Sequence, residues 1–106
     1  MTTSEVFIVS NRIEVEADRA EAFEGVFIDS MRTTLEGVPG LHRVTLQKPA
    51  RPGLPYISTM EFDNAASFQA WLKSDSFKAS HSDQQAEGMQ APNEVELHTL
   101  IEDISF

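Results

Sequence analysis

The sequence predicts an α+β fold in which four strands form one antiparallel sheet and two helices cover one of its faces. Three observations support this prediction. Several segments alternate between apolar and polar residues, which is the period of a strand. Two other segments carry apolar residues at helical spacing. The predicted elements follow one another in the order β-α-β-β-α-β, and the length of 106 residues fits a single domain spanning 1-106.

The first strand is predicted from Val6 to Glu16, where successive side chains point to opposite faces. One face carries polar residues together with Val6 and Ile8. The other face, which we expect the helices to cover, carries Phe7, Val9, Asn11, Ile13 and Val15.

A helix is predicted next. Asp18 and Glu21 have the spacing of a capping box, which marks a helix N-terminus. Gly37 and Pro39 end the helix, as expected just beyond a C-terminus. Its apolar stripe recurs every four residues and consists of Phe23, Phe27, Met31 and Leu35.

Two further strands are predicted, from Leu41 to Lys48 and from Tyr56 to Phe62. The stretch from Pro49 to Pro55 contains three prolines and a glycine, which is typical of a turn. One face of the later strand carries Tyr56, Ser58, Met60 and Phe62.

The second helix is predicted to begin at a cap formed by Asp63 or Asn64, and its apolar side carries Phe68, Trp71 and Leu72. The Ser74-Asp75-Ser76 sequence offers side chains that compete for the hydrogen bonds of a helix. We therefore expect a break there, and a new cap before a short helix from Phe77 to Ser80.

The rest of the chain is predicted to be a loop and a strand. The segment from His81 to Pro92 is polar and has almost no apolar residues, which is typical of a loop, whereas Glu94 to Phe106 is predicted to be the last strand. The full order is the ferredoxin-like pattern. Its uncovered sheet face carries residues such as Ile8 and Thr45, and such faces tend to associate. We expect a homodimer packed sheet against sheet, that is, a dimeric α/β barrel.

Charge and composition exclude several classes of function. The formal net charge is −9, with 8 basic and 17 acidic residues, and there is no basic cluster. This argues against nucleic acid and against an anionic membrane surface as partners. The absence of cysteine excludes disulfides and thiolate chemistry. The N-terminal residues do not resemble a secretory signal, and no apolar run reaches membrane-spanning length, so a cytoplasmic location is expected.

Asn11 is out of place, because it lies between Val9 and Ile13 on the apolar face of the first strand. Burying an amide without partners costs about 1–3 kcal/mol. Asn11 either bonds to local backbone or sits at a bulge, or it points into a pocket and bonds to a ligand.

Trp71 and His81 are two further candidate site residues, and each also has an ordinary structural explanation. Trp71 is the only tryptophan, and an aromatic residue at helical spacing is usually part of the core; when buried, its N–H also needs a partner. His81 follows the short helix, where a histidine is usually solvated, although its imidazole could also ligate a flat cofactor. His42 and His98 lack the spacing of a compact zinc site.

Together these segments resemble the antibiotic biosynthesis monooxygenase (ABM) superfamily and, within it, the IsdG-type haem-degrading monooxygenases. The similarity runs from Phe7 to the last strand, and its clearest pieces are Asn11-Arg12-Ile13, Thr34 to Gly37 and Trp71 to His81. The last piece is common to the superfamily, including members that do not bind haem. The set of Asn11, Trp71 and His81 is more specific. In this chain 60 positions separate Asn11 from Trp71 and ten separate Trp71 from His81, and these spacings resemble those of the haem-degrading members.

The resemblance implies a mechanism in which haem is both cofactor and substrate. His81 would be the proximal ligand of the haem iron, which leaves the other side open to O2. Asn11 would hydrogen-bond oxygen or the reacting porphyrin edge. Trp71 would press on the macrocycle, and Phe27 would be a further wall of the cofactor site. An electron donor or reductase would be required, and iron and an opened tetrapyrrole would leave.

Two other functions remain open at this stage. One is a cofactor-independent ABM-type monooxygenase acting on a quinol-like aromatic, in which Asn11 and Trp71 hold the substrate. The other is a non-catalytic haem-binding protein or dimeric ligand sensor.

Overall fold

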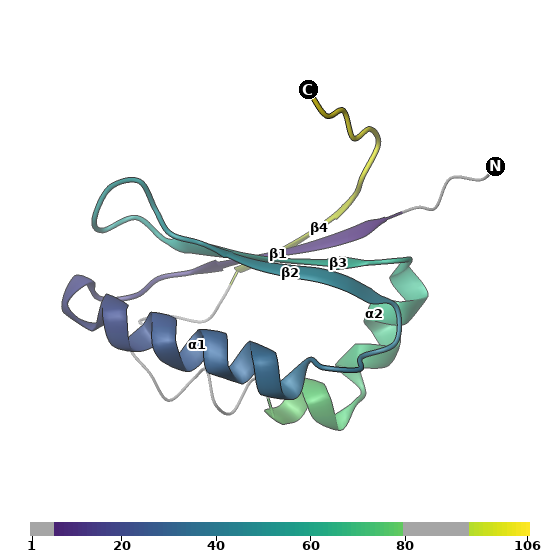
Figure 1. Ribbon diagram of the computed structural model, residues 1–106, viewed down its shortest axis with the longest axis horizontal. Helices are drawn as coiled ribbons and strands as arrows, with labels where there is room; N and C mark the ends of the chain where they lie inside the picture. Colours follow the sequence, from purple (N-terminus) through teal and green to yellow (C-terminus); the bar gives the residue numbers. More distant parts are fainter. Residues whose placement is uncertain (1–5, 80–93) are drawn as a thin grey trace.

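The computed structural model describes residues 6–79 and 94–106. Its four strands pair in the spatial order β2-β3-β1-β4, and every pairing is antiparallel (Figure 1). A further short helical segment covers 75–79. The elements in chain order are β1 (Phe7–Ile13), the 3-10 turn η1 (Ala17–Arg19), α1 (Ala20–Thr34), β2 (Leu41–Gln47), β3 (Tyr56–Phe62), α2 (Ala65–Leu72) and β4 (Glu94–Thr99). This confirms the predicted ferredoxin-like β-α-β-β-α-β fold.

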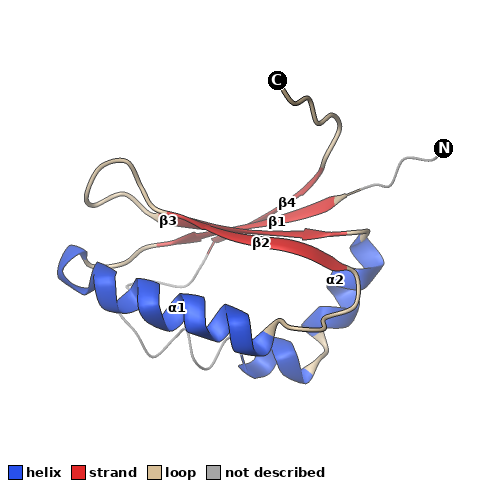
Figure 2. Ribbon diagram, in the orientation of Figure 1, coloured by secondary structure: helices blue, strands red, loops and turns tan. Residues whose placement is uncertain are grey.

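The described helices all lie on one side of the sheet (Figure 2). We call the sheet face that they cover the inner face and the opposite one the outer face. The segment after β4 leaves the sheet on the outer side. No helix among residues 6–79 and 94–106 is long and apolar enough to cross a membrane.

The alternation predicted for the strands is confirmed. Along β3, Tyr56, Ser58, Met60 and Phe62 are buried, whereas the residues between them are only partly buried. In β1, Val9 and Ile13 are buried on the same face. Asn11 is paired with Ser58 on one side and with Val95 on the other.

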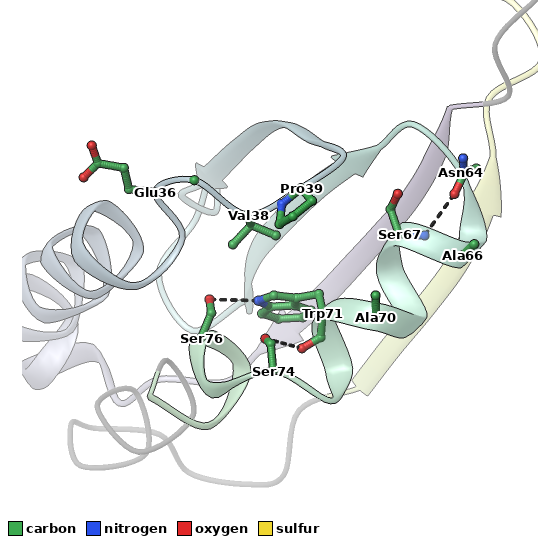
Figure 3. A pocket seen from close by; sticks show the side chains of 11 residues that line it. Glu36, Val38, Pro39, Asn64, Ala66, Ser67, Ala70, Trp71, Ser74 and Ser76 are labelled. Atoms are coloured by element: carbon green, nitrogen blue, oxygen red, sulfur yellow. Dashed lines mark hydrogen bonds between the residues drawn. The ribbon is translucent and has the colours of Figure 1, made fainter.

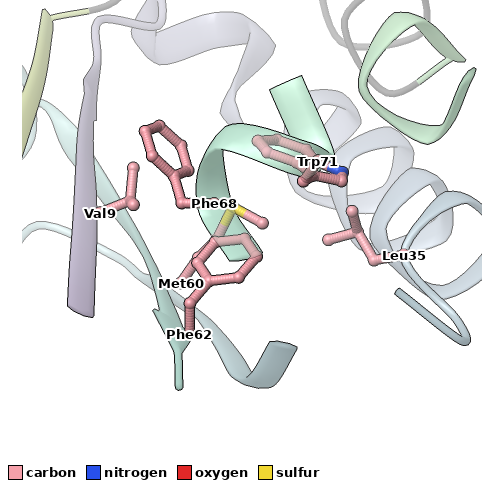
Figure 4. Packing of buried hydrophobic residues seen from close by; sticks show 6 residues of the cluster. All are labelled: Val9, Leu35, Met60, Phe62, Phe68 and Trp71. Atoms are coloured by element: carbon pink, nitrogen blue, oxygen red, sulfur yellow. The ribbon is translucent and has the colours of Figure 1, made fainter. Parts of the chain in front are cut away.

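The core consists of two apolar clusters that lie along the inner face. We call the first the Trp71 cluster; it contains Val9, Leu35, Met60, Phe62, Phe68 and Trp71 (Figure 4). We call the second the Phe27 cluster; it contains Ile13, Phe23, Phe27 and Tyr56. Met31 of α1 packs against both clusters.

The predicted capping box at the first helix is wrong. The chain enters α1 through the 3-10 turn η1, and neither Glu16 nor Arg19 forms a side-chain capping bond. Backbone hydrogen bonds replace it: Arg19 N donates to Glu16 O at 2.9 Å, and Ala20 N donates to Ala17 O. These bonds use N–H groups that a cap would otherwise serve.

Three predicted strands are too long, and the smallest excess is in β2, which ends at Gln47 and not at Lys48. β1 ends at Ile13, which pairs with Tyr56, the first residue of β3; the next position on that strand is Pro55, which has no N–H to donate. β4 ends at Thr99, which pairs with the first residue of β1. The last backbone bond beyond it runs from Leu100 N to Val6 O at 2.9 Å. Residues 100–106 are therefore not a strand.

The cap and the break predicted around the second helix are confirmed, but the short helical segment begins at residue 75, two positions before the predicted start at Phe77. The Asn64 side chain accepts a hydrogen bond from Ser67 N at 2.9 Å. The helix stops at Leu72, and Ser74 Oγ accepts from Phe77 N at 3.3 Å at the start of the next helical segment.

Candidate functional site

Asn11 lies on the inner face in the middle of β1. Its Oδ1 atom is buried and accepts no hydrogen bond. The pairing of β1 with β3 and β4 is regular at this position, so Asn11 does not sit at a bulge. The side chain therefore keeps an unused acceptor in an apolar layer, at a cost of about 1–3 kcal/mol. Buried groups of this kind call for an explanation, and ligand binding is one.

Two serines accompany Asn11 on the inner side of the sheet. Ser58 is buried and is the β3 partner of Asn11. Ser30 of α1 is 3% exposed, and its Oγ atom is buried without a hydrogen-bond partner. We call Asn11, Ser30 and Ser58 the polar band. Sequence reasoning placed Ser58 on the correct face without singling it out, and it missed Ser30.

Phe27 borders the polar band from the helix layer. Its ring is 2% exposed, and its centroid lies 5.2 Å from that of Phe23. Because Ser30 follows Phe27 by one helical turn, the two side chains are neighbours on the helix surface. Phe27 is therefore packed in the core beside Ser30, and its predicted role as a wall of a cofactor site stays a prediction.

Trp71 is a core residue with a fixed orientation. Its ring packs edge-on against Phe77, with centroids 5.0 Å apart, and tilted against Phe62 at 6.1 Å. Its Nε1 donates to Ser76 Oγ at 3.0 Å, and Ser76 Oγ in turn donates to the carbonyl oxygen of Thr34. The N–H partner that the sequence left open is therefore Ser76 (Figure 3). The second bond of Ser76, to Thr34 O, connects this contact to the end of α1.

One edge of Trp71 lines an open groove of about 610 Å³ between α2 and the loop that follows α1 (Figure 3). The groove has mixed apolar and polar walls. Its lining residues are Glu36, Gly37, Val38, Pro39, Asn64, Ala66, Ser67, Ala70, Trp71, Ser74 and Ser76. Neither Asn11 nor Phe27 is among them. Asn11 and Trp71 are linked only indirectly, because Val9, on the same face of β1 as Asn11, packs within the Trp71 cluster.

His81 and the predicted 81–92 loop lie outside the described residues. The helical segment 75–79 leads toward His81 in the chain. The other two histidines are exposed, His42 at the start of β2 and His98 on the outer side of β4, opposite Ile8. Within 6–79 and 94–106 there is no group of three or more metal-ligating side chains.

Among the titratable groups of residues 6–79 and 94–106, one is strongly perturbed. The Tyr56 hydroxyl donates a hydrogen bond to Glu24 Oε2, which lies 3.7 Å from Lys48 Nζ. Burial of the phenol, together with the hydrogen bond and negative charge of Glu24, raises the pKa of Tyr56 to about 12. The phenol therefore remains a protonated hydrogen-bond donor at neutral pH, at the edge of the Phe27 cluster.

Comparison with solved structures gives close matches in fold at low sequence identity. The haem degrader MhuD from Mycobacterium tuberculosis is 19% identical, with a TM-score of 0.78 over 93% of this chain and 99% of that one. SnoaB, a cofactor-independent oxygenase from Streptomyces nogalater, is 22% identical, with a TM-score of 0.72 over 96% and 98% of the two chains. A Caulobacter crescentus CB15 protein described as an antibiotic biosynthesis monooxygenase is 19% identical, with a TM-score of 0.77 over 93% and 92%.

A search of the curated proteins gives no significant match. The comparison with protein families does, and it covers more than half of the chain, from β1 through the helical segment that follows α2. At residues 6–83 the sequence matches the family described as Antibiotic biosynthesis monooxygenase, and the chain therefore belongs to that family.

Proposed function

We propose that this ABM-family monooxygenase degrades haem, which it takes as both cofactor and substrate, and that it releases iron. The observation that carries the proposal is the buried, unpartnered Oδ1 of Asn11 on the inner face. A polar group kept at such a cost within an apolar layer is suited to bind a flat, mostly apolar ligand at one chosen point. The spacing of Asn11, Trp71 and His81, which the sequence resemblance associates with haem degradation, favours haem as that ligand.

Four residues would each have a separate role in this reaction. His81 would hold the iron, and Asn11 would orient O2 or the reacting edge of the porphyrin through its amide. Trp71 would form a rigid wall, since Ser76 and Phe77 fix its ring. Phe27 would form a second wall beside the polar band. Haem supplies the redox-active iron and the carbon that is oxidised, and O2 and an electron donor or reductase complete the reaction. We propose that residues 1–106 act as one domain in the cytoplasm.

A second candidate is a cofactor-independent monooxygenase that acts on a quinol-like aromatic. SnoaB, which shares this fold, is a cofactor-independent oxygenase. In this case the free Oδ1 of Asn11 would accept a hydrogen bond from a substrate hydroxyl, because an amide oxygen is an acceptor.

A hemin titration separates the candidates. We expect a saturable Soret shift at about one haem per chain, weakened by His81→Ala and unchanged by His42→Ala, because His42 is an exposed side chain of β2 with no proposed contact to haem. Ascorbate in air, with catalase present to remove peroxide, should then bleach the wild-type complex. Binding without bleaching would indicate a non-catalytic haem-binding protein. If hemin does not bind saturably, the haem proposal is wrong and the quinol-like substrate becomes the leading candidate.

We further propose that the chain acts as a homodimer packed through its outer sheet faces. No described helix covers that face, on which the two central strands β1 and β3 carry Ile8 and Ile57. The segment after β4 stands off on the same side, with Ile101 93% exposed and Ile104 66% exposed. Apolar side chains held away from their own chain favour contact with a second copy.

The oligomeric state tests this part of the proposal. Light scattering should give twice the monomer mass, and Ile101→Glu with Ile104→Glu should shift the protein toward monomer. Ala22→Glu, an exposed change on α1, is the control. A wild-type protein that is monomeric at micromolar concentration would contradict the dimer.

A further inference from the structure

We propose that Ser30 is a ligand-contacting residue that acts with Asn11 to position the bound substrate from the opposite wall. The inference rests on the proposed function, because it takes the substrate to lie between α1 and the inner face of the sheet. Nothing in the sequence pattern or in the family comparison assigns a role to this serine.

The hydroxyl of Ser30 is buried and unused. Among the described residues, only two buried side-chain nitrogen or oxygen atoms lack a hydrogen-bond partner, Asn11 Oδ1 and Ser30 Oγ. One comes from β1 and the other from α1, the layers on either side of the core. A buried polar group without a partner costs free energy that replacement by an apolar group would remove.

The side chain of Ser30 lies on the apolar stripe of α1. Ser30 follows Phe23 and Phe27 at the spacing that keeps side chains on one face of a helix. Both phenylalanines pack in one cluster with Ile13 and Tyr56 of the sheet. Since Ser30 is 3% exposed on this same stripe, its side chain belongs to the face of α1 that is turned to the sheet.

Ser30 lies where the two apolar clusters of the core meet. Its neighbour Met31 packs against both apolar clusters, so this turn of α1 lies at their junction. Asn11 lies at the same junction, because Val9 on one side of it belongs to the Trp71 cluster and Ile13 on the other side belongs to the Phe27 cluster. Asn11 and Ser30 are therefore both placed at the junction of the two clusters, one on the sheet and the other on α1.

Ser30 differs from Thr33 and Thr34 of the same helix in how its hydroxyl is used. A helical Ser or Thr ordinarily satisfies its hydroxyl by bonding to a carbonyl of the preceding turn. Thr33 Oγ1 does so with Asp29 O at 3.0 Å, and Thr34 Oγ1 donates to Ser30 O at 2.6 Å. Ser30 makes no such bond, so its hydroxyl remains available to a ligand.

The test compares Ser30→Ala with Thr33→Ala, which removes a hydroxyl on the exposed side of the same helix. Calorimetry measures the dissociation constants for two probes, hemin and 1,4-dihydroxynaphthalene. Thermal unfolding without ligand measures whether Ser30 supports the fold. We expect Ser30→Ala to weaken binding of the probe that the wild type takes up by about 2- to 12-fold, the usual range for one hydrogen bond. Its Tm should equal or exceed that of the wild type, and Thr33→Ala should bind as the wild type does.

The outcomes separate this inference from the proposed function. If the wild type binds hemin and Ser30→Ala binds it equally well, the role of Ser30 is wrong while the haem proposal stands. If only the naphthalene binds and Ser30→Ala weakens it, the role of Ser30 stands and haem is the wrong ligand. A clear drop in the Tm of Ser30→Ala would make Ser30 a structural residue and overturn the inference. If the wild type binds neither probe, both proposals fail.

Discussion

Tyr56 offers a direct test of the buried contact between β3 and α1. It is the only tyrosine in the chain, so absorbance of the tyrosinate ion near 295 nm reports on this side chain alone. The Tyr56 hydroxyl donates to Glu24, and burial and this carboxylate raise the pKa of Tyr56 to about 12 from an ordinary value of 10.0. The folded protein should therefore keep its phenol protonated well above pH 10, whereas the urea-unfolded protein should titrate near pH 10.

The same shift predicts how stability depends on pH. Because the pKa is higher in the folded state, the contribution of Tyr56 is fully present below pH 10 and is lost as the pH rises to about 12. A difference of two pKa units corresponds to about 2.7 kcal/mol. At neutral pH, Tyr56→Phe should lower the free energy of unfolding by about 1.5–3 kcal/mol, the worth of a hydrogen bond to a charged group.

Urea unfolding of the wild type and of Tyr56→Phe at a series of pH values from 8 to 12 gives the assay. The difference between the two proteins isolates Tyr56, because Lys48 and every other titrating group are present in both. The difference should shrink as the pH passes from 10 to 12. A folded-state titration midpoint near pH 10, or a difference that does not change with pH, would refute the reasoning.

Three further predictions concern stability. Ser76→Ala should destabilise the fold by about 1–3 kcal/mol, because it removes both the acceptor for Trp71 Nε1 and the donor to Thr34 O. Denaturant unfolding, followed by the fluorescence of the single tryptophan, measures this loss, and an unchanged midpoint would contradict the prediction. Gly40→Ala should destabilise by more than about 1 kcal/mol, since Gly40 has φ +80° and an added Cβ would lie 2.6 Å from Ser67 Cβ. Gly25→Ala should instead stabilise by about 0.5–1 kcal/mol, because the position is exposed in the middle of α1 and nothing lies within 4 Å of the added Cβ; a lower Tm would count against it.

The order of the elements and the faces of the strands could be predicted from the sequence. Periodicity reveals them because the period of a strand or a helix is a property of the local backbone. β3 and the break after Leu72 match the prediction, and the cap at Asn64 was one of two predicted alternatives. Asn11 could be singled out for the same reason, since an amide between Val9 and Ile13 interrupts a local pattern.

The ends of elements were predicted less well, because they depend on partners that are distant in the chain. β1 stops where β3 reaches Pro55, and β4 stops where β1 begins. The capping box at Asp18 and Glu21 did not form, because backbone bonds in the 3-10 turn took its place.

The sequence by itself determined the fold class, the family resemblance and the unusual position of Asn11, because all three depend on residue types at fixed separations along the chain. Only the tertiary structure decided which polar groups find partners. Trp71 Nε1 donates to Ser76, and Ser76 in turn donates to Thr34, which is 42 positions away in the sequence. Ser30 Oγ has no partner. Hydrogen-bond satisfaction depends on the packing of α1, α2 and the sheet against one another, and no local pattern encodes that packing.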